Sequence, residues 1–195
     1  MILTDKKIRE LAKENELITP FEEENLQSES YDVTIGTELT VMKKEIRCLD
    51  ISKQDDIDSA YRHIDISRDG YIISPKEYVW VSLGEMIKLP DNLTAHMRPK
   101  TRYTRLGLIV GDQHCNSTYT GHLRIGIFNA TDYPIRIYSG VTIAQLVFEK
   151  LDGIPSSEKL YKNKQNAHYQ NENGAFRGAK FDDEYLDSLW DKILE

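Results

Sequence analysis

Cationic residues gather in the stretch HMRPKTRYTRLGL, residues 96–108, although the chain as a whole carries a net charge of −7. Arginine and lysine donate charge-assisted hydrogen bonds to phosphate oxygens, and hydroxyl groups add neutral donors. The stretch therefore indicates a pocket for an oligophosphate, with a solvated surface connection as the alternative. The cationic and hydroxyl-bearing residues are Arg98, Lys100, Thr101, Arg102, Thr104 and Arg105.

A second candidate is NSTYTGHLRIGIFN, residues 116–129, which reads as a hydroxyl-rich turn followed by a strand. Apolar residues alternate along it at Leu123, Ile125 and Ile127, as in a half-buried strand. The segment contains no acid, although the chain holds 32 Asp and Glu residues. Acid–base catalysis needs a group that transfers protons, so the sequence leaves open whether this turn belongs to a working active site.

Motifs of several other enzyme classes are missing from the sequence. There is no GxSxG, P-loop, Rossmann glycine pattern or zinc-deaminase signature. Cys48 and Cys115 lack ligand spacing, and the five His residues are scattered, so neither a zinc site nor a disulfide framework is predicted. The negative net charge disfavours duplex nucleic-acid binding, but local arginines and lysines still allow a small anionic ligand.

Short β-rich runs separated by turn residues fill residues 31–148, among them YDVTIG, LGLIVG and VTIAQLVFEKL. This regular alternation of short strands and turns predicts a mainly β fold, an antiparallel jelly roll or barrel, rather than a βαβ fold. The polar stretch at 53–70 is predicted to be an excursion between strands. The domain prediction is a β domain over 1–151 with an N-terminal helix, a polar C-terminal segment over 152–180, and a terminal helix over 181–195.

Helical spacing of apolar residues occurs at both ends of the chain. The first helix is predicted to start after Thr4, a plausible N-cap, and to end at Pro20. The stretch FDDEYLDSLWDKILE, 181–195, predicts an amphipathic helix that needs a surface to dock on. No apolar run reaches the roughly 18 residues of a membrane span, and the N-terminus lacks a signal-peptide core. We therefore expect a cytoplasmic protein without membrane contact.

Several stretches together resemble one family, the dCTP deaminases of the trimeric dUTPase superfamily. RPKTRYTRLGL is similar to the family's phosphate loop, and PFEEENLQSESYDVTIG to its SYDLRLG-type motif. GHLRIGIFN resembles the strand after the substrate turn, and GVTIAQLVFEKL the IxQLxF motif. YKNKQNAHYQNENGAF is similar to the C-terminal segment that closes over the nucleotide. The resemblance covers roughly residues 1–178 and implies a distorted jelly roll of the dUTPase type.

The phosphate loop, by this resemblance, binds triphosphate and helps to fix the reacting water. Lys100 and Thr101 stand where the family has Arg and Ser, and Arg102 replaces a second small polar residue. Arg105 matches the family's second Arg. The resemblance therefore makes Thr101 and Arg105 candidate catalytic residues, and Lys100, Thr101 and Arg102 candidate nucleotide-binding residues.

Further nucleotide contacts follow from the same resemblance. Tyr119 is expected under the deoxyribose, and Gln145 on the triphosphate side. Phe176 is similar to the aromatic residue that covers the base in dUTPases, with simple packing as the alternative. The C-terminal segment supplies a tyrosine and two basic residues around the phosphates. The candidate nucleotide-binding residues outside the phosphate loop are Asn116, Tyr119, Gln145, Tyr161, Lys164, His168 and Phe176.

The two proton-handling acids of the family are replaced in this sequence. The Glu of the strand after the turn reads Gly126, and the Asp of the turn reads Asn116. Glycine cannot transfer a proton, and an amide holds water or a sugar hydroxyl but is no general base at neutral pH. Because the hairpin is shortened, Asp112, His114 or His122 could approach the vacated place. Asp112 is the first candidate catalytic acid, with a solvated turn residue as its alternative. Asn116, at the place of the turn's Asp, is also a candidate catalytic residue.

The resemblance implies a hydrolase of nucleotide metabolism that converts dCTP to dUTP and ammonia without zinc. Two alternatives stay open: a dUTP diphosphatase that forms dUMP and pyrophosphate, because Gly126 resembles that branch, and a catalytically degenerate nucleotide-binding regulator. Magnesium is expected with the bound triphosphate, and no metal site of the protein's own. A homotrimer is expected, because the family's sites lie between subunits.

Overall fold

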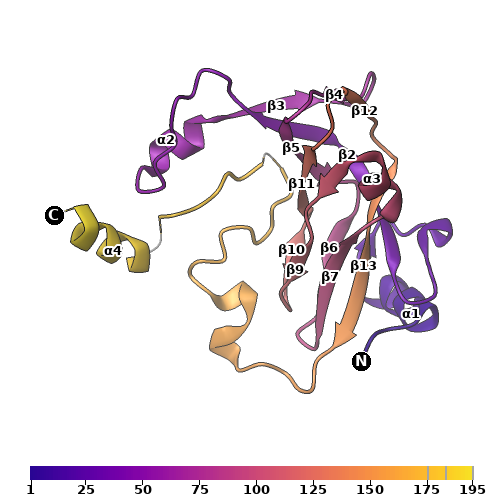
Figure 1. The fold of residues 1–195 in the computed structure, drawn as a ribbon. Coiled ribbons are helices and arrows are strands. Elements are labelled where there is room, and N and C mark those ends of the chain that lie inside the picture. The colour runs from indigo at the N-terminus through magenta and orange to yellow at the C-terminus, as the bar shows by residue number, and fades with distance from the viewer. Residues whose placement is uncertain (175, 183, 195) are drawn as a thin grey trace.

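The computed structural model describes residues 1–174, 176–182 and 184–194 of the chain. A curled β body carries a helix at the N-terminal end, and a long C-terminal segment leads to a second helix (Figure 1). The helices and 3-10 turns are α1 (Asp5–Asn15), η1 (Glu23–Asn25), α2 (Gln54–Ser59), α3 (Thr101–Leu106), η2 (Ser157–Lys159), η3 (Tyr161–Asn163) and α4 (Glu184–Leu194). The strands are β1 (Ile18–Thr19), β2 (Tyr31–Met42), β3 (Tyr61–Asp65), β4 (Tyr71–Ile73), β5 (Tyr78–Leu83), β6 (Met86–Lys88), β7 (Leu93–Pro99), β8 (Leu108–Val110), β9 (Gln113–Cys115), β10 (Thr120–Gly121), β11 (Arg124–Asn129), β12 (Ile135–Ile137) and β13 (Thr142–Lys150).

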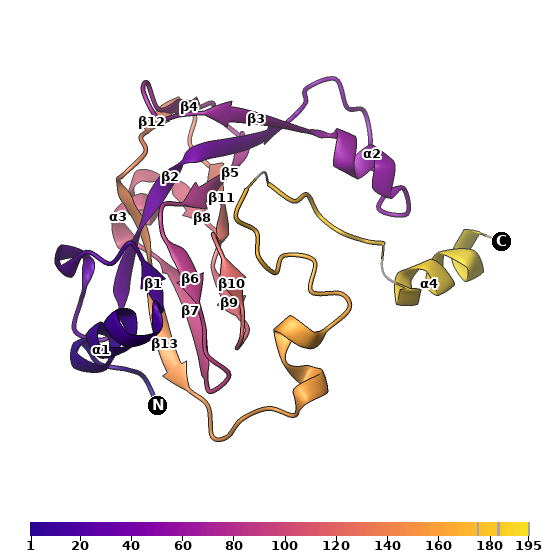
Figure 2. The ribbon, with the colours of Figure 1, turned by 180° about the vertical axis from the view of Figure 1, so that it is seen from behind.

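An eight-stranded sheet forms most of the body, in the order β8-β11-β5-β2-β13-β7-β9, with β3 paired to β2. Its pairings are antiparallel. A three-stranded sheet, β1-β6-β10, and the pair β12-β4 complete the body. The sheet curls round one core (Figures 1 and 2). The predicted mainly β, distorted antiparallel jelly roll with a helix at each end is confirmed.

Strand β2 joins the two halves of the large sheet. Its first residues pair with β13, whereas its last residues pair with β3 and β5. The register against β5 shifts between Ile35 and Leu39, and Gly36 lies at this shift. A Cβ at Gly36 would lie 2.5 Å from the Ser82 hydroxyl oxygen and 3.0 Å from the Leu83 carbonyl oxygen, so a side chain there would require its neighbours to shift. Glycine therefore lets the strand change partners and curve the sheet.

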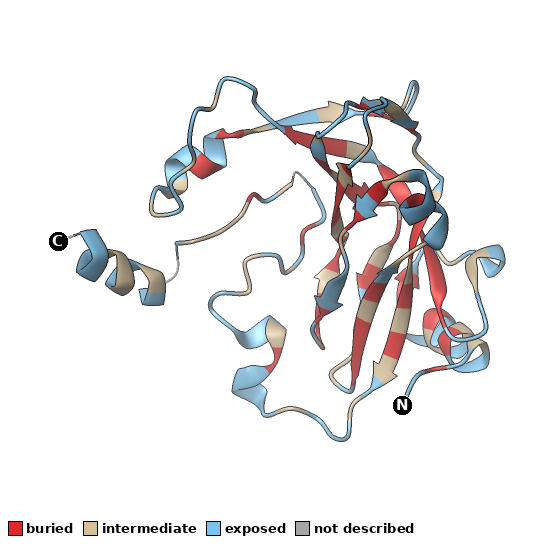
Figure 3. Ribbon diagram, viewed as in Figure 1, coloured by how far each residue is buried: buried red, intermediate tan, exposed pale blue. Residues whose placement is uncertain are grey.

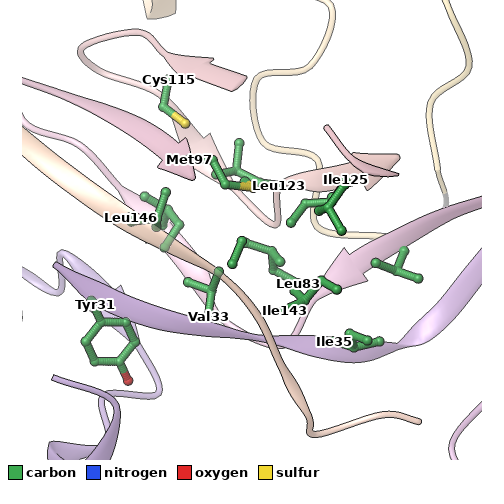
Figure 4. Packing of buried hydrophobic residues seen from close by; sticks show 14 of the residues in the cluster. Tyr31, Val33, Ile35, Leu83, Met97, Cys115, Leu123, Ile125, Ile143 and Leu146 are labelled. Atoms are coloured by element: carbon green, nitrogen blue, oxygen red, sulfur yellow. The ribbon is translucent and has the colours of Figure 1, made fainter. Parts of the chain in front are cut away.

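The core lies inside the curl, where apolar side chains of facing strands meet (Figure 4). Val33 and Ile35 of β2 belong to this core together with Met97 of β7 and Ile125 of β11. Tyr31 of β2 is buried beside Phe21, with ring centroids 5.4 Å apart. Burial of each such side chain contributes about 1.5 to 3 kcal/mol. The buried positions follow the strands, while the C-terminal segment and α4 are mostly half-buried or exposed (Figure 3).

Helix α1 covers one edge of this core. Thr4 is its N-cap in extended conformation, as predicted, and Ile8 and Ala12 are its buried residues. The helix does not continue to Pro20: it ends at Asn15, because Glu16 adopts a left-handed conformation at φ 55°. The prediction that Pro20 ends the helix was therefore wrong by one turn.

The polar stretch at 53–70 is ordered structure rather than a plain excursion. It contains α2 and then β3, which pairs with β2 from Glu38↔Asp65 to Met42↔Tyr61. Ile57 and Ile66 anchor the stretch in buried positions. The excursion prediction is corrected, since the hydrophobic signal of this edge strand is weak.

Beyond β13 the chain runs along the open side of the body and ends in α4, which stands away from the barrel (Figures 1 and 2). Tyr185 and Ile193 of α4 are 73% and 61% exposed, whereas Leu186, Leu189 and Trp190 are half-buried. The predicted docking surface for this helix stays a prediction. Among the described residues, no helix is long and apolar enough to cross a membrane.

Candidate functional site

A cavity of about 600 Å³ opens between the 116–121 turn, the strands next to it and the C-terminal segment. Cys115, Asn116 and Tyr119 line it from the turn side. Tyr161 and Phe176 line it from the C-terminal segment. In Figure 1 this segment crosses the open side of the sheet beside β9 and β10. The cavity is thus made by two parts of the chain that are distant in sequence.

Hydrogen bonds fasten the C-terminal segment to the turn. The Gln170 side chain donates to the carbonyl of Thr118 at 3.0 Å and accepts from the Thr120 N–H at 3.2 Å. The Asn171 N–H donates to the Thr120 carbonyl at 2.8 Å, and the His122 N–H to the Glu172 carbonyl at 3.0 Å. Backbone pairing of this kind fixes where the side chains of the segment enter the cavity.

Aromatic rings close one end of the cavity. Phe176 packs against Tyr61 with ring centroids 5.0 Å apart and against Trp80 at 5.6 Å. Tyr61 and Trp80 meet edge to face at 5.6 Å. Such pairs hold one another in place, and their rings form an apolar wall that suits a flat heterocycle.

Tyr78 covers the position where the family's strand carboxylate is expected. Gly126 of β11 pairs with Trp80 of β5, and a Cβ built at Gly126 would overlap the hydroxyl and ring of Tyr78. The Tyr78 ring in turn packs on Trp80 at 4.8 Å. A side chain at position 126 would therefore have to displace Tyr78, so this strand position supplies no acid to the site.

Two buried charged residues face each other inside the cavity. The Nε of Arg124 lies 3.6 Å from Oε1 of Glu172, and its Nη1 lies 3.6 Å from Oε1 of Glu38. The side chains of Arg124 and Glu172 are 9% and 4% exposed. Burial raises the pKa of the Glu172 carboxyl, while the Arg177 N–H and Arg124 oppose the rise. A carboxyl with a raised pKa in a cavity is a candidate for proton transfer.

Groups of the turn are held in their neutral forms. Burial raises the pKa of the Cys115 thiol to about 12, so this thiol is no nucleophile at neutral pH. Burial, helped by the negative charge of Glu172, also raises the pKa of Tyr119. Asn116 accepts the Tyr119 N–H at its backbone carbonyl at 3.1 Å. Tyr119 and Asn116 therefore present neutral polar groups to the cavity.

The predicted phosphate loop lies elsewhere, on α3, on the far side of the barrel from the C-terminal segment (Figures 1 and 2). Thr101, Arg102 and Arg105 are exposed there. Lys100 instead forms an ion pair with Asp32, which is buried. None of these four residues lines the cavity of its own chain.

His114, one of the alternatives for the missing acid, lines the cavity, whereas the other remaining predicted residues lie outside its lining. Asp112 is 63% exposed and pairs with Arg98 at 2.8 Å, so the structure places it in solvent. Gln145 accepts a hydrogen bond from Ser30 on β2's side of the sheet at 3.4 Å. Lys164 is exposed. The Nε2 of the half-buried His168 lies 3.9 Å from a carboxylate oxygen of Asp182.

Of the predicted contacts, the structure brings Asn116, Tyr119, Tyr161 and Phe176 together in one cavity. The sequence interpretation missed Arg124 and Glu172. Arg124 stands two residues before Gly126, hence on the same face of β11, and this spacing could have indicated it. Glu172 carries no comparable signal, because only the contact between the C-terminal segment and the turn brings it into the cavity.

The chain matches the family model described as dCTP deaminase-like over residues 2–151. It is 33% identical to a protein of Persephonella marina named dCTP deaminase, dUMP-forming, over 89% of this chain and 94% of that protein. It is 32% identical to a protein of the same name from Aquifex aeolicus, over 96% of this chain and 99% of that protein.

The fold is similar to that of a solved 2'-deoxycytidine 5'-triphosphate deaminase from Agrobacterium tumefaciens, with a TM-score of 0.62 and 22% identity. That match covers 76% of this chain and 47% of the other chain. The matched family model spans the whole β body, including the turn and α3. The chain belongs to the dCTP deaminase-like family.

Proposed function

We propose that this protein binds a pyrimidine deoxynucleoside triphosphate and deaminates dCTP to dUTP and ammonia. The observation that carries the proposal is the cavity between the 116–121 turn and the C-terminal segment, in a chain of the dCTP deaminase-like family. Residues 152–180 would then be the part of the chain that covers the nucleotide. A cytoplasmic location, where deoxynucleotides are used, belongs to the proposal.

The two ends of the cavity suit the two neutral parts of such a ligand. Trp80 and Phe176 line the cavity and would contact the pyrimidine, and stacking of a base on an aromatic ring is worth about 1 to 3 kcal/mol. Asn116 and Tyr119 lie at the turn, where their polar groups can meet the sugar hydroxyl. The cavity therefore has room and partners for a nucleoside.

The triphosphate would be bound by α3 of a neighbouring copy. Arg102 and Arg105 are exposed on the side of the barrel opposite the C-terminal segment (Figure 2), so they cannot serve the cavity of their own chain. A closed ring of identical subunits repeats one interface, which would bring each α3 to the next subunit's cavity. We propose a homotrimer on this ground and on the family relationship.

Magnesium is proposed as a companion of the triphosphate rather than a resident of the protein. In the described part of the chain, no group of three or more His, Cys, Asp or Glu residues has the arrangement to hold a metal ion. Phosphate oxygens together with one or two carboxylates or waters commonly bind magnesium. The ion would neutralise the triphosphate, and it would not position residues of the fold.

Two alternatives have observations of their own. Hydrolysis of dUTP to dUMP and pyrophosphate fits the second half of the name of the relatives called dCTP deaminase, dUMP-forming, whose first half describes deamination. Binding without turnover fits Tyr78, which covers Gly126 where the family's acid is expected. These alternatives predict different products from the same binding site.

One set of assays separates the three functions. The purified protein with magnesium is given dCTP or dUTP, and ammonia, pyrophosphate and bound nucleotide are measured. We expect ammonia from dCTP. Pyrophosphate from dUTP with no ammonia from dCTP would favour the diphosphatase. Binding without either product would favour the regulator, and no binding would contradict a nucleotide site.

A further inference from the structure

The cavity contains a carboxylate in a place that the family pattern does not indicate. Among the described residues that line it, Glu172 is the one acid, and its charged companions there are Arg124 and Arg177. The strand position that should carry the family's acid is closed by Tyr78. If the site performs hydrolysis, the proton-transferring group must come from another element.

Glu172 is held firmly enough to have a defined position. Its backbone forms a bridge with Gly121, and its carbonyl accepts the His122 N–H at 3.0 Å. Gly121 has φ 146°, and a Cβ there would lie 2.9 Å from the Glu172 nitrogen. The close approach of the two backbones therefore depends on glycine at position 121.

The carboxylate of Glu172 is oriented from two sides. Oε1 accepts the Arg177 N–H at 2.7 Å and lies 3.6 Å from Nε of Arg124. That Nε is buried, and among the described residues it has no hydrogen-bond partner. Arg124 is placed by a further bond from Nη2 to the Gly174 carbonyl. Glu172 and Arg124 therefore place a hydrogen-bond acceptor beside a donor that has no partner among the described residues. Arg124 stands two residues before Gly126 on β11.

We infer that Glu172 is the residue that transfers protons at the pyrimidine ring, in place of an acid on β11. This inference rests on the proposed dCTP deamination. Its raised pKa, caused first by burial, would bring the acid and base forms closer to balance near neutral pH. Arg124 would hold the carboxylate in position as it changes charge.

In the proposed deamination, Glu172 acts first as a base and then as an acid. The carboxylate of Glu172 takes a proton from water while the water oxygen bonds to C4 of cytosine, and the electron pair of the C4–N3 double bond moves to N3. Glu172 passes this proton to N3. Glu172 then carries the proton of the new hydroxyl to the exocyclic amino group. The bond between C4 and this amino nitrogen breaks with its electron pair on nitrogen, and ammonia leaves as C4 becomes a carbonyl carbon.

The test uses Glu172→Gln, which keeps the shape and the acceptor oxygen for the Arg177 N–H. Because lost acid–base catalysis costs about 10²- to 10⁴-fold in rate, kcat for ammonia release from dCTP should fall at least about 100-fold. The affinity for dCTP, measured by calorimetry, should change less than about threefold, since an amide of equal size remains. Glu158→Gln, an exposed residue of the same C-terminal segment, is the matched control and should behave like the wild type.

A second variant guards against a merely structural effect. Glu172→Asp keeps the carboxylate and should retain at least about ten times the kcat of the Gln variant, because misplaced acid–base groups lose only part of their effect. The rate of the wild type should fall on the acid side as pH drops through the raised pKa, and this limb should vanish in Glu172→Gln. The groups that face Glu172 and contribute to this pH response are Glu38, Tyr119, Arg124, Tyr161, Tyr169 and Arg177.

The outcomes separate the two proposals. Ammonia from the wild type together with unimpaired kcat in Glu172→Gln would overturn the role of Glu172 while leaving deamination in place. Equal loss in the Gln and Asp variants, or a loss that comes only from weaker dCTP binding, would also overturn it. A wild type that binds dCTP and releases no ammonia would contradict the proposed deamination and, with it, the proton transfer.

Discussion

The arginine side chain of β11 is buried and paired in the cavity, whereas the arginine side chains of α3 are exposed. In the cavity, Arg124 is buried and lies 3.6 Å from carboxylate oxygens of both Glu38 and Glu172. On α3, Arg102 and Arg105 are exposed at the surface. The first arrangement is complete within one chain, whereas the second has the character of a binding surface. Under the proposed function, the nucleoside half of the site is therefore formed within one chain, whereas the phosphate half needs a neighbouring copy.

Arg124→Ala should have the largest effect on stability. It leaves Glu38 and Glu172 without their buried cation, and breaking a buried ion pair by removing one partner costs about 3 to 5 kcal/mol. We expect the free energy of unfolding, measured in urea, to fall by about 3 kcal/mol. A loss below about 1 kcal/mol, the value of an exposed pair, would contradict the buried network.

Arg105→Ala should show the opposite behaviour. Its stability should stay within about 0.5 kcal/mol of the wild type, as is usual for surface substitutions. Its affinity for dCTP should fall about tenfold or more, because a hydrogen bond to a charged group contributes about 1.5 to 3 kcal/mol. Unchanged affinity by calorimetry would mean that the triphosphate is bound elsewhere and that the cationic stretch is a surface connection.

Gly126→Glu tests how firmly Tyr78 is packed over position 126. The new side chain must displace Tyr78, and overpacking costs about 1 to 3 kcal/mol, so the free energy of unfolding should fall by about 2 kcal/mol. Thr104→Glu, on the exposed face of α3, is the control and should be neutral. A Gly126→Glu protein as stable as the wild type would show that Tyr78 yields easily.

Asp112→Asn should have the smallest effect. Asp112 is exposed and pairs with Arg98 at the surface, and such pairs are worth about 0 to 1 kcal/mol. The free energy of unfolding should stay within about 1 kcal/mol of the wild type, and the rate of ammonia release within about twofold. Abolished turnover with intact nucleotide binding would restore the sequence-based hypothesis that Asp112 replaces the missing acid, and would remove the role of Glu172.

The jelly roll could be predicted because alternating apolar residues and turn residues carry it directly. Strand β3 could not, since Arg62, His63 and Asp65 are polar and only Tyr61 and Ile64 are half-buried. An edge strand of this composition is held by pairing with β2 rather than by its own apolar pattern. The end of α1 was also hidden, because Glu16 is a non-glycine residue in a left-handed conformation.

The candidate site shows the same division. Asn116, Tyr119 and Phe176 could be assigned through their resemblance to family motifs, and the structure brings them into one cavity. Arg124 and Glu172 could not, because charged residues are expected at the surface and these two are buried only by the contact between β11 and the C-terminal segment. Tertiary contacts of this kind leave no periodic signal in the sequence.

The most direct test of a site shared between copies is sedimentation velocity with a fluorescent dCTP analogue and magnesium, over a range of protein concentrations. If α3 of one copy completes the cavity of another, the analogue should sediment with the oligomer, and nucleotide should shift the assembly equilibrium toward it by linkage. Analogue bound to a monomeric species with undiminished affinity would contradict the account.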